Sequence, residues 1–205
     1  MFGFFKNSTK VPPIDVAAEA KEEKGVLLYA LVALGLALFI RFFVATPYLV
    51  SGSSMDDTFH NNNYLIVDRL SYRLTDPKRG DVIVFTLPTT MERDLIKRVI
   101  GLPGETVRIQ NNAVTIFNTV HPQGVVLNEP YLTPAYIGGP DNIQVTIPAN
   151  EYFVLGDHRN VSLDSRSWGF LPRTEIVGRV FLRLFPFTQI NVLPGEARYP
   201  ELSAQ

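Results

Sequence analysis

The chain has 205 residues, of which 46% are hydrophobic and 19% are charged, and its formal net charge is -1. This length suits one globular domain plus an anchor, and the near-neutral charge disfavours both intrinsic disorder and a surface that binds a polyanion such as nucleic acid. The sequence contains no cysteine, which excludes disulfides, thiolate zinc sites and a cysteine nucleophile.

The N-terminal part of the chain changes character at residue 25. Residues 1–24 mix lysines with acidic residues and show no sustained apolar periodicity, which predicts a loosely ordered tail. Residues 25–45 are apolar except for Arg41, whose long side chain can extend to lipid headgroups. As a helix, about 20 such residues span the roughly 30 Å hydrocarbon core of a bilayer. We expect one transmembrane helix; the alternatives are a cleavable signal peptide, which is usually shorter, and a buried core helix.

The charges around this segment indicate its orientation. Arg41 lies at its far end, whereas four lysines precede it: Lys6, Lys10, Lys21 and Lys24. The positive-inside rule therefore predicts a cytoplasmic tail, with residues 46–205 on the other side of the membrane.

Residues 46–205 have the composition of an antiparallel, mainly β domain. Short β-branched and aromatic runs alternate with turn residues, and Asn111-Asn112 and Pro103-Gly104 are strong reversal signals. Strands are expected at residues 64–68, 81–87, 95–100, 106–110, 113–117, 144–147, 152–155 and 178–184.

Three segments of this domain carry groups that could perform chemistry. The first, residues 51–55, is a Ser/Gly cluster with Met55 after the apolar segment, which on its own is typical of a flexible linker. In the second, Lys97 shares one strand face with Leu95 and Val99. Such apolar surroundings can lower a lysine pKa by several units from about 10.4, as a lysine base requires. The alternatives are an edge-strand lysine that discourages aggregation and a lysine whose side chain extends to solvent.

A third segment, residues 156–169, is dense in hydrogen-bonding groups. It contains two Asp, two Arg and three Ser residues directly after an expected strand. Ser162 could hold the amine of a catalytic lysine through a hydrogen bond, and Asp164 and Arg166 could form a structural ion pair.

These segments belong to a set of blocks that resembles the bacterial type I signal peptidases, or leader peptidases, which are serine proteases with a Ser-Lys dyad. The resemblance runs from about residue 41 to the last strand. Each block alone is weak, but five in family order are specific. They are Ser54-Met55, Arg79 to Phe85, Ile96 to Glu105, Asn128 to Tyr131, and Gly156 to Arg166.

The resemblance implies a signal-peptidase-like antiparallel β-sheet or partial barrel on one N-terminal transmembrane helix. It implies a membrane-bound endopeptidase that removes signal peptides from exported preproteins, cutting after small residues at positions -1 and -3. Ser54 is then the nucleophile and Lys97 the general base. The supporting residues are Ser162, Gly52, Asp164 and Arg166, and the substrate-binding residues are Met55, Phe59, Leu95 and Ile96. The partners are signal peptides and the lipid bilayer, with no cofactor, metal or nucleic acid.

The chain departs from the family pattern at a few positions. Asp57 replaces a proline and Phe59 a leucine, which is expected to alter the substrate pocket, and His158 stands where asparagine is common. The oxyanion hole is expected to use the backbone N–H of Ser54. Its second donor stays open, with the hydroxyls of Ser51 and Ser53 as candidates.

Two other functions are compatible with parts of the sequence. One is a self-cleaving Ser-Lys protease similar to the LexA-type repressors, but that reading needs an N-terminal DNA-binding module where the apolar segment lies. The other is an inactive membrane-tethered β domain that binds exported chains, which the joint presence of Ser54, Lys97 and Ser162 disfavours.

Overall fold

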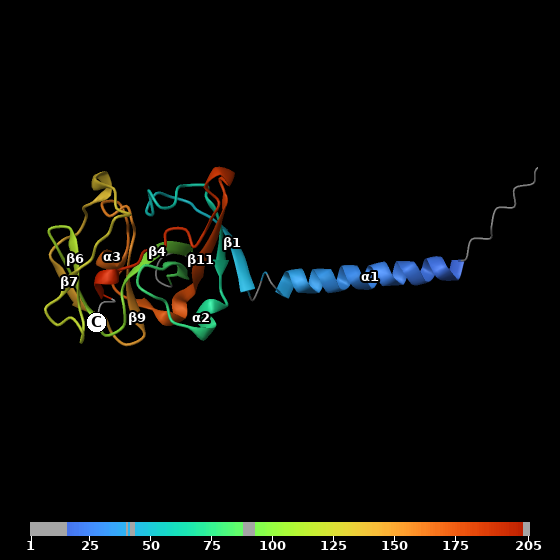
Figure 1. Cartoon of the computed structure of the whole chain (residues 1–205), viewed down its shortest axis with the longest axis horizontal. Coiled ribbons are helices and arrows are strands. Elements are labelled where there is room, and N and C mark those ends of the chain that lie inside the picture. The colour runs from blue at the N-terminus through green and yellow to red at the C-terminus, as the bar shows by residue number, and fades with distance from the viewer. Residues whose placement is uncertain (1–15, 40, 42–43, 88–92, 203–205) are drawn as a thin grey trace, which may run out of the picture. The chain divides into compact units, whose positions relative to one another are not determined.

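The computed structural model describes residues 16–39, 41, 44–87 and 93–202. The chain divides after Arg41 into two units. The first, Met1–Arg41, contains helix α1 (Val16–Phe39), and the second, Phe42–Gln205, contains all the described strands (Figure 1).

Helix α1 differs in its bounds from the expected segment of residues 25–45. It begins at Val16, inside the expected tail, because residues 16–24 are rich in Ala, Glu and Lys, which favour helix. It ends at Phe39, and a strand begins at Ala45, shortly before Pro47, which a helix interior tolerates poorly. Among the described residues, no helix combines the length and apolar character that crossing a membrane requires. Residues 1–15 of the expected tail lie outside the described residues.

The second unit is built from two antiparallel sheets, which confirms the mainly β prediction, and each of the eight expected strands is present. The larger sheet has the order β1 (Ala45–Leu49), β2 (Tyr64–Asp68), β11 (Ile176–Phe185), β3 (Val82–Thr86), β4 (Asp94–Gly101), β9 (Glu151–Leu155) and β10 (Leu171–Pro172), with β12 (Asn191–Val192) paired to β11. The smaller sheet has the order β7 (Val125–Val126), β6 (Ala113–Phe117), β5 (Thr106–Gln110) and β8 (Ile143–Thr146).

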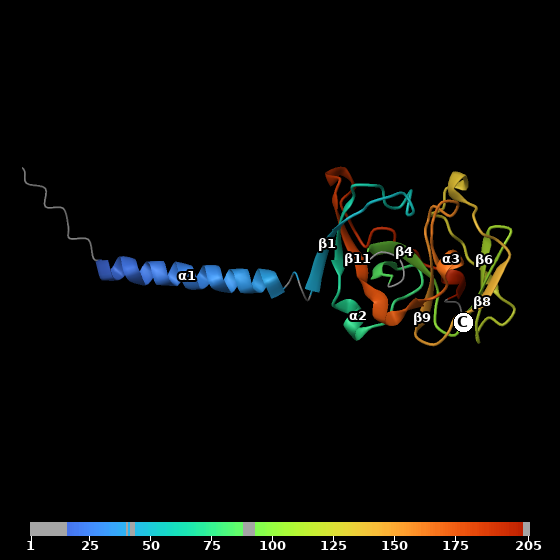
Figure 2. The same ribbon diagram turned by 180° about the vertical axis from the view of Figure 1, so that it is seen from behind.

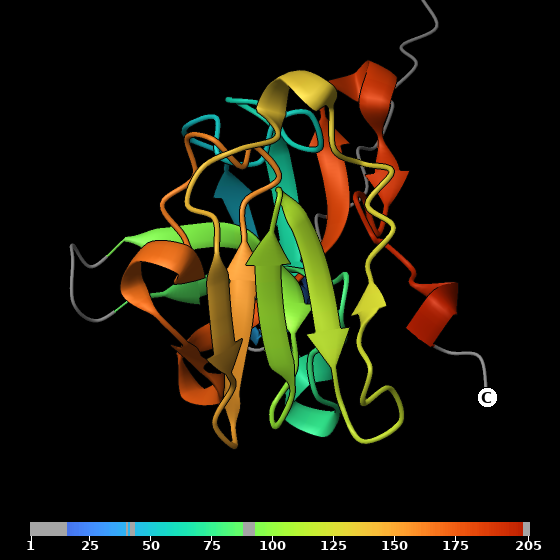
Figure 3. The same cartoon turned by 90° about the vertical axis from the view of Figure 1, so that its left-hand side faces the viewer.

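The two sheets occupy different ends of the second unit. Strands β1 and β6 lie at opposite ends of this unit in the views from both sides (Figures 1 and 2), and the smaller sheet faces the viewer in Figure 3. Asn111 and Asn112 both have positive φ and form the two-residue turn between β5 and β6. A buried apolar cluster joins the smaller sheet to β4 and β9, and includes Ile100, Val107, Ile116, Phe153 and Leu155.

Several connections between the strands contain short helical turns. The α-helical turns are α2 (Ser71–Leu74) and α3 (Ser165–Trp168). The 3-10 turns are η2 (Pro134–Tyr136), η3 (Arg173–Glu175), η4 (Phe187–Gln189) and η5 (Pro200–Leu202).

Strand β4 has one edge that is only partly paired. Its edge toward β3 is paired from Asp94 to Arg98, whereas its pairing with β9 runs from Arg98 to Gly101. Within the described ranges, residues 94–97 therefore have no sheet partner on the β9 side. Strand β1 is likewise the end strand of its sheet, and β2 is its partner among the strands that the structure describes. The two free edges border the candidate site.

Candidate active site

The expected nucleophile lies in a tight loop that follows β1. The base of this loop is closed by two backbone hydrogen bonds, from Val50 N to Asn63 O and from Asn62 N to Val50 O, both of 2.9 Å. Gly52 has a φ of +103°, which residues with a side chain rarely adopt, and its N–H donates to Asn61 Oδ1 at 3.1 Å. This conformation turns the chain so that Ser54 comes back toward β4.

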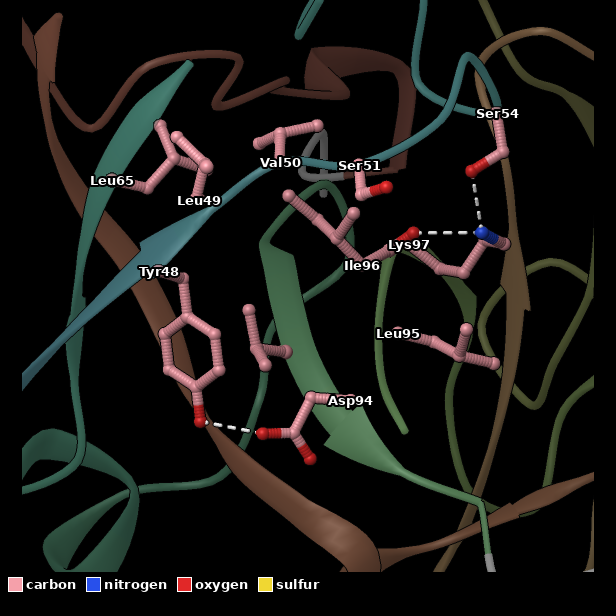
Figure 4. Close-up of a pocket in the computed structure, with 11 residues that line it drawn as sticks. Tyr48, Leu49, Val50, Ser51, Ser54, Leu65, Asp94, Leu95, Ile96 and Lys97 are labelled. Atoms are coloured by element: carbon pink, nitrogen blue, oxygen red, sulfur yellow. Dashed lines mark hydrogen bonds between the residues drawn. The ribbon is translucent and has the colours of Figure 1, made fainter. Parts of the chain in front are cut away.

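The side chains of Ser54 and Lys97 meet. Nζ of Lys97 lies 2.7 Å from Oγ of Ser54 and 2.8 Å from the carbonyl oxygen of Ile96 (Figure 4). The lysine side chain enters from β4, where Lys97 pairs with Ile83, and its residue is only 3% exposed. Two groups 43 positions apart in the sequence are thus within hydrogen-bonding distance, although neither lies in a segment that is distinctive alone.

The surroundings of Lys97 favour its neutral form. Burial lowers the pKa of its amine from 10.5 to about 8, and this effect outweighs the opposing influence of the negative charges on Asp164 and Asp157. Among the described residues, no carboxylate forms an ion pair with Nζ; its hydrogen-bond partners are a hydroxyl and a carbonyl. A neutral amine in this position can accept the proton of the Ser54 hydroxyl.

Ser162 is buried near the same loop but does not hold the lysine in this structure. Its Oγ is buried without a hydrogen-bond partner among the described residues. A Cβ placed on Gly156 would clash both with the side chain of Ser162 and with the carbonyl oxygen of Ser54. Gly156 therefore permits the close approach of these two serines, and the role of Ser162 in orienting Lys97 stays a prediction.

Asp164 and Arg166 form the ion pair that the sequence suggests. Nε of Arg166 donates to Oδ1 of Asp164, and Nη2 donates to Oδ2, both at 2.8 Å, with both side chains buried. Asp164 also accepts the N–H of Gly156 at 3.0 Å and caps α3, while Arg166 bonds the carbonyls of Gly138 and Arg159. The pair thus fixes the loop that carries Ser162.

A second buried ion pair, which the sequence did not single out, involves the residue next to Lys97. Arg98 donates from Nε to Oδ1 of Asp157 at 2.8 Å and from Nη2 to Oδ2 at 2.6 Å. Thr58, in the nucleophile loop, donates to the same carboxylate at 2.5 Å. Asp157 therefore ties β4 to the loop that carries Ser54.

A cavity of about 110 Å³ opens beside the Ser54–Lys97 contact (Figure 4). Leu95 and Ile96, which the family resemblance assigned to substrate binding, both line it, as do Ser54 and Lys97 themselves. Its other lining residues are Tyr48, Leu49, Val50, Ser51, Leu65, Val84 and Asp94.

Met55 and Phe59, also expected to bind substrate, are not among these lining residues. Both are fully buried in an apolar cluster that includes Val50, Leu65 and Val84, and these three residues do line the cavity. Met55 and Phe59 thus pack behind the cavity wall, because the loop after Ser54 turns their side chains into the core.

Tyr48 and Asp94 are site residues that the sequence reasoning missed. The hydroxyl of Tyr48 donates to Oδ2 of Asp94 at 2.8 Å and joins β1 to β4 at the end of the cavity away from Lys97 (Figure 4). Burial, together with the hydrogen bond and charge of Asp94, raises the pKa of Tyr48 to about 12, so the hydroxyl stays protonated at neutral pH. The sequence did not indicate this pair, because β1 was not expected to be a strand.

Within the described ranges, no group of three or more His, Asp or Glu residues is arranged to hold a metal ion.

Comparison with known proteins identifies the family. Residues 24–185 match the family model described as signal peptidase, peptidase S26. The chain belongs to this family of signal peptidases. It is 38% identical over 204 residues to signal peptidase I of Leptolyngbya laminosa, covering 93% of this chain and 95% of the relative. It is 40% identical over 169 residues to a probable signal peptidase I-2 of Synechocystis sp., covering 79% and 73% respectively.

A further curated relative agrees. Signal peptidase I of Bacillus caldolyticus is 35% identical over 181 residues, with coverage of 82% of this chain and 95% of the relative. A crystal structure of a signal peptidase I from Enterococcus faecalis is 34% identical, with a TM-score of 0.43 and coverage of 52% of this chain and 97% of that chain. The family match and the curated relatives show that the chain is an enzyme of the type I signal peptidase class.

Proposed function

We propose that this enzyme is a membrane-bound serine endopeptidase that removes signal peptides from exported preproteins, with Ser54 as nucleophile and Lys97 as general base. The observation that carries the proposal is the 2.7 Å contact between Ser54 Oγ and the buried Lys97 Nζ. A lysine that burial moves toward its neutral form, in direct contact with a hydroxyl, is what general-base activation of serine requires.

The reaction follows from this geometry. Ser54 Oγ attacks the scissile carbonyl while its proton passes to Nζ of Lys97, which becomes an ammonium. The ammonium then returns the proton to the leaving amine as the peptide C–N bond breaks, leaving the signal peptide esterified to Ser54. Water attacks this ester while Lys97 accepts its proton, and the Lys97 ammonium then returns that proton to Ser54 Oγ as the ester C–O bond breaks, which frees the signal peptide and regenerates the enzyme.

The oxyanion of the tetrahedral intermediate needs hydrogen-bond donors. The backbone N–H of Ser54 is the first donor that we propose. Of the two hydroxyls considered for the second, Ser51 lines the cavity with Ser54, which supports its choice over Ser53. Gly52 supports the hole indirectly, because its positive φ shapes the loop and its own N–H is engaged by Asn61.

We propose that the cavity binds the substrate residues at positions -1 and -3, where small side chains are expected. An extended peptide between the free edges of β1 and β4 would direct alternate side chains, about 6.6 Å apart, to one face. The cavity on that face has an aliphatic wall formed by Val50, Leu65, Val84 and Ile96 and a volume of about 110 Å³.

Apolar surfaces on each unit support attachment to a bilayer. In α1, apolar side chains between Val26 and Phe39 are exposed, which is costly in water and favourable in lipid. We propose that residues 25–45 anchor the chain in the plasma membrane, with the N-terminus cytoplasmic and the catalytic domain outside.

The catalytic domain has an exposed apolar row of its own. Leu49, Tyr64 and Phe185 are consecutive partners across β1, β2 and β11, and Phe187 packs edge-to-face on Phe185 with ring centroids 5.5 Å apart. Leu49 also lines the cavity. This row supports contact with the membrane interface close to where a signal peptide would be cut.

The experiment is cleavage of a purified preprotein by detergent-solubilised enzyme and by its Ser54→Ala and Lys97→Ala variants. The exposed residues Ser167 and Lys78 provide matched controls of the same chemistry, as Ser167→Ala and Lys78→Ala. We expect cleavage by the wild type and both controls, and none by the two site variants. Cleavage by either site variant at the wild-type rate would remove the dyad assignment, and cleavage confined to the enzyme's own chain would favour self-cleavage.

A further inference from the structure

Two consecutive residues connect the lysine-bearing strand to the nucleophile loop. Asp157 holds Arg98, the neighbour of Lys97, through two hydrogen bonds of 2.8 and 2.6 Å. The next residue, His158, donates its backbone N–H to the carbonyl oxygen of Ser54 at 3.1 Å. The Asp157–His158 dipeptide therefore sets the position of Ser54 relative to Lys97.

The ring of His158 makes a second contact with the same loop. Its Nδ1 lies 3.1 Å from the carbonyl oxygen of Ser53. A carbonyl oxygen can only accept, so this hydrogen bond requires Nδ1 to carry a hydrogen. The side chain of His158 is 15% exposed, and its ring stacks against Tyr136 with centroids 3.9 Å apart. The orientation of the donor is thus constrained by packing.

The hydrogen bond from His158 to the Ser53 carbonyl affects the N–H of Ser54, which is the proposed oxyanion donor. The carbonyl of Ser53 and the N–H of Ser54 belong to one planar peptide unit. A donor on the carbonyl oxygen fixes the plane of this unit and, because hydrogen bonds in series polarise one another, makes its N–H a stronger donor. The N–H of Asp56 also donates to Ser53 O, at 3.1 Å, so His158 is one of two groups that do so.

We propose that His158 is a positioning residue that orients and polarises the Ser53–Ser54 peptide, so that the N–H of Ser54 stabilises the oxyanion. The inference rests on the proposed function, in which that N–H is an oxyanion donor. His158 touches neither the substrate nor the Ser54 hydroxyl in this scheme; it acts through the backbone. Its effect therefore belongs to the transition state and not to ground-state binding of the peptide.

Two substitutions separate the donor from the ring. In His158→Asn, the amide nitrogen occupies the place of Nδ1 and keeps a donor for Ser53 O, while the aromatic ring is lost. In His158→Phe, a ring that can stack on Tyr136 remains, but the donor is lost. His60→Asn is the control, because His60 lies in the same loop and its ring contacts Asp56, 2.9 Å away.

The measurement is kcat and KM on a fluorogenic signal-peptide substrate, with the affinity for a peptide boronate that forms a tetrahedral adduct on serine. Removing an entire oxyanion donor costs roughly 10²–10³-fold in kcat, and weakening one costs less. We expect His158→Phe to lose about tenfold in kcat and in boronate affinity with KM nearly unchanged. His158→Asn and His60→Asn are expected to stay within about twofold of wild type.

The inference is overturned if the Phe variant retains wild-type kcat, or if the Asn and Phe variants fall equally while circular dichroism shows both folded. A loss confined to KM would also contradict it. Ser54→Ala and Lys97→Ala are measured in parallel. If they remain active, the proposed function fails; if they are inactive while His158→Phe is unimpaired, the role of His158 alone fails. If His158→Phe does not fold, His158→Leu, which also lacks the donor, is measured in its place. A wild-type kcat in that variant would show that the donor is not needed.

Discussion

Lys97 and Arg98 are adjacent cations on opposite faces of β4, both buried, and their surroundings give them opposite properties. Arg98 is 0% exposed and faces the carboxylate of Asp157, whereas the hydrogen-bond partners of Lys97 are the Ser54 hydroxyl and a backbone carbonyl. Burial lowers the pKa of both, but for Arg98 the charge and hydrogen bonds of Asp157 outweigh burial and raise the net pKa. For Lys97 burial prevails.

The difference shows how one strand can carry a structural cation on one face and a reactive amine on the other. A buried cation with a carboxylate partner is held charged and serves as a fixed tie between β4 and the loops. A buried cation with only neutral partners is destabilised in its charged form, and this makes it available as a base. The predictions below test this contrast, from the largest expected effect to the smallest.

Removing the amine on the reactive face is expected to have the largest effect. Lys97→Met keeps an unbranched apolar stem but leaves Ser54 without a base, so kcat should fall by roughly 10⁴-fold, or about 5 kcal/mol of barrier. The rate of preprotein cleavage measures this, with Lys78→Met as the exposed control. A fall of less than about tenfold contradicts the role of Lys97 as the base.

Removing the charge on the structural face should lower stability instead. Asp157→Asn leaves Arg98 buried with half of its partner lost, and breaking such a pair typically costs about 3–5 kcal/mol. Urea unfolding of the detergent-solubilised protein gives the change in free energy, and Asp76→Asn, at an exposed carboxylate, is the control. A loss below about 1 kcal/mol would mean that the pair does not hold the loops.

On the reactive face of β4, replacing the buried cation should change the free energy of unfolding in the opposite direction. The pKa of Lys97 is lowered from 10.5 to about 8 in the folded state, so its charged form destabilises the fold most below pH 8. Lys97→Met should therefore raise the free energy of unfolding by roughly 1–3 kcal/mol at pH 7. The gain should shrink as pH rises from 8 toward 10.5. A variant less stable than wild type at pH 7 goes against this account.

Ser162 is expected to show the smallest change in stability. Its buried Oγ has no partner among the described residues, so Ser162→Ala removes no hydrogen bond seen here and should alter the free energy of unfolding by less than about 1 kcal/mol. If Ser162 contacts Lys97 during turnover, kcat falls while stability is kept. A loss of several kcal/mol would instead show that its hydroxyl is bonded in the folded protein.

The strands of the second unit could largely be predicted from sequence, because their apolar runs and turn residues are local signals. The runs at Thr106–Gln110 and Ala113–Phe117 have the expected bounds, since Asn111 and Asn112 favour the positive φ that their turn requires. β1 was missed because its five residues follow an apolar segment without a break. The pairing of β1 and β4 with their neighbours depends on distant contacts that no local pattern reveals.

The residues of the site were predicted with less success than the strands. Ser54, Lys97 and the Asp164–Arg166 pair came from motifs in family order, and the structure brings Ser54 and Lys97 into contact. Tyr48 and Asp94 were missed, because their hydrogen bond joins strands 46 positions apart. Met55 and Phe59 were expected in the cavity, but the turn after Ser54 directs both into the core, and a turn of this kind cannot be read from residue type.

The central claim is that Lys97 is neutral when Ser54 reacts, and the pH dependence of Ser54 acylation tests it most directly. In single-turnover experiments, the acylation rate should rise with pH and level off with a midpoint near 8, the pKa to which burial lowers the amine. The rate should rise with pH because the fraction of Lys97 in the free-amine form increases over this interval. A rate that is independent of pH between 6 and 9, or a midpoint near the ordinary lysine value of about 10.4, would contradict the account.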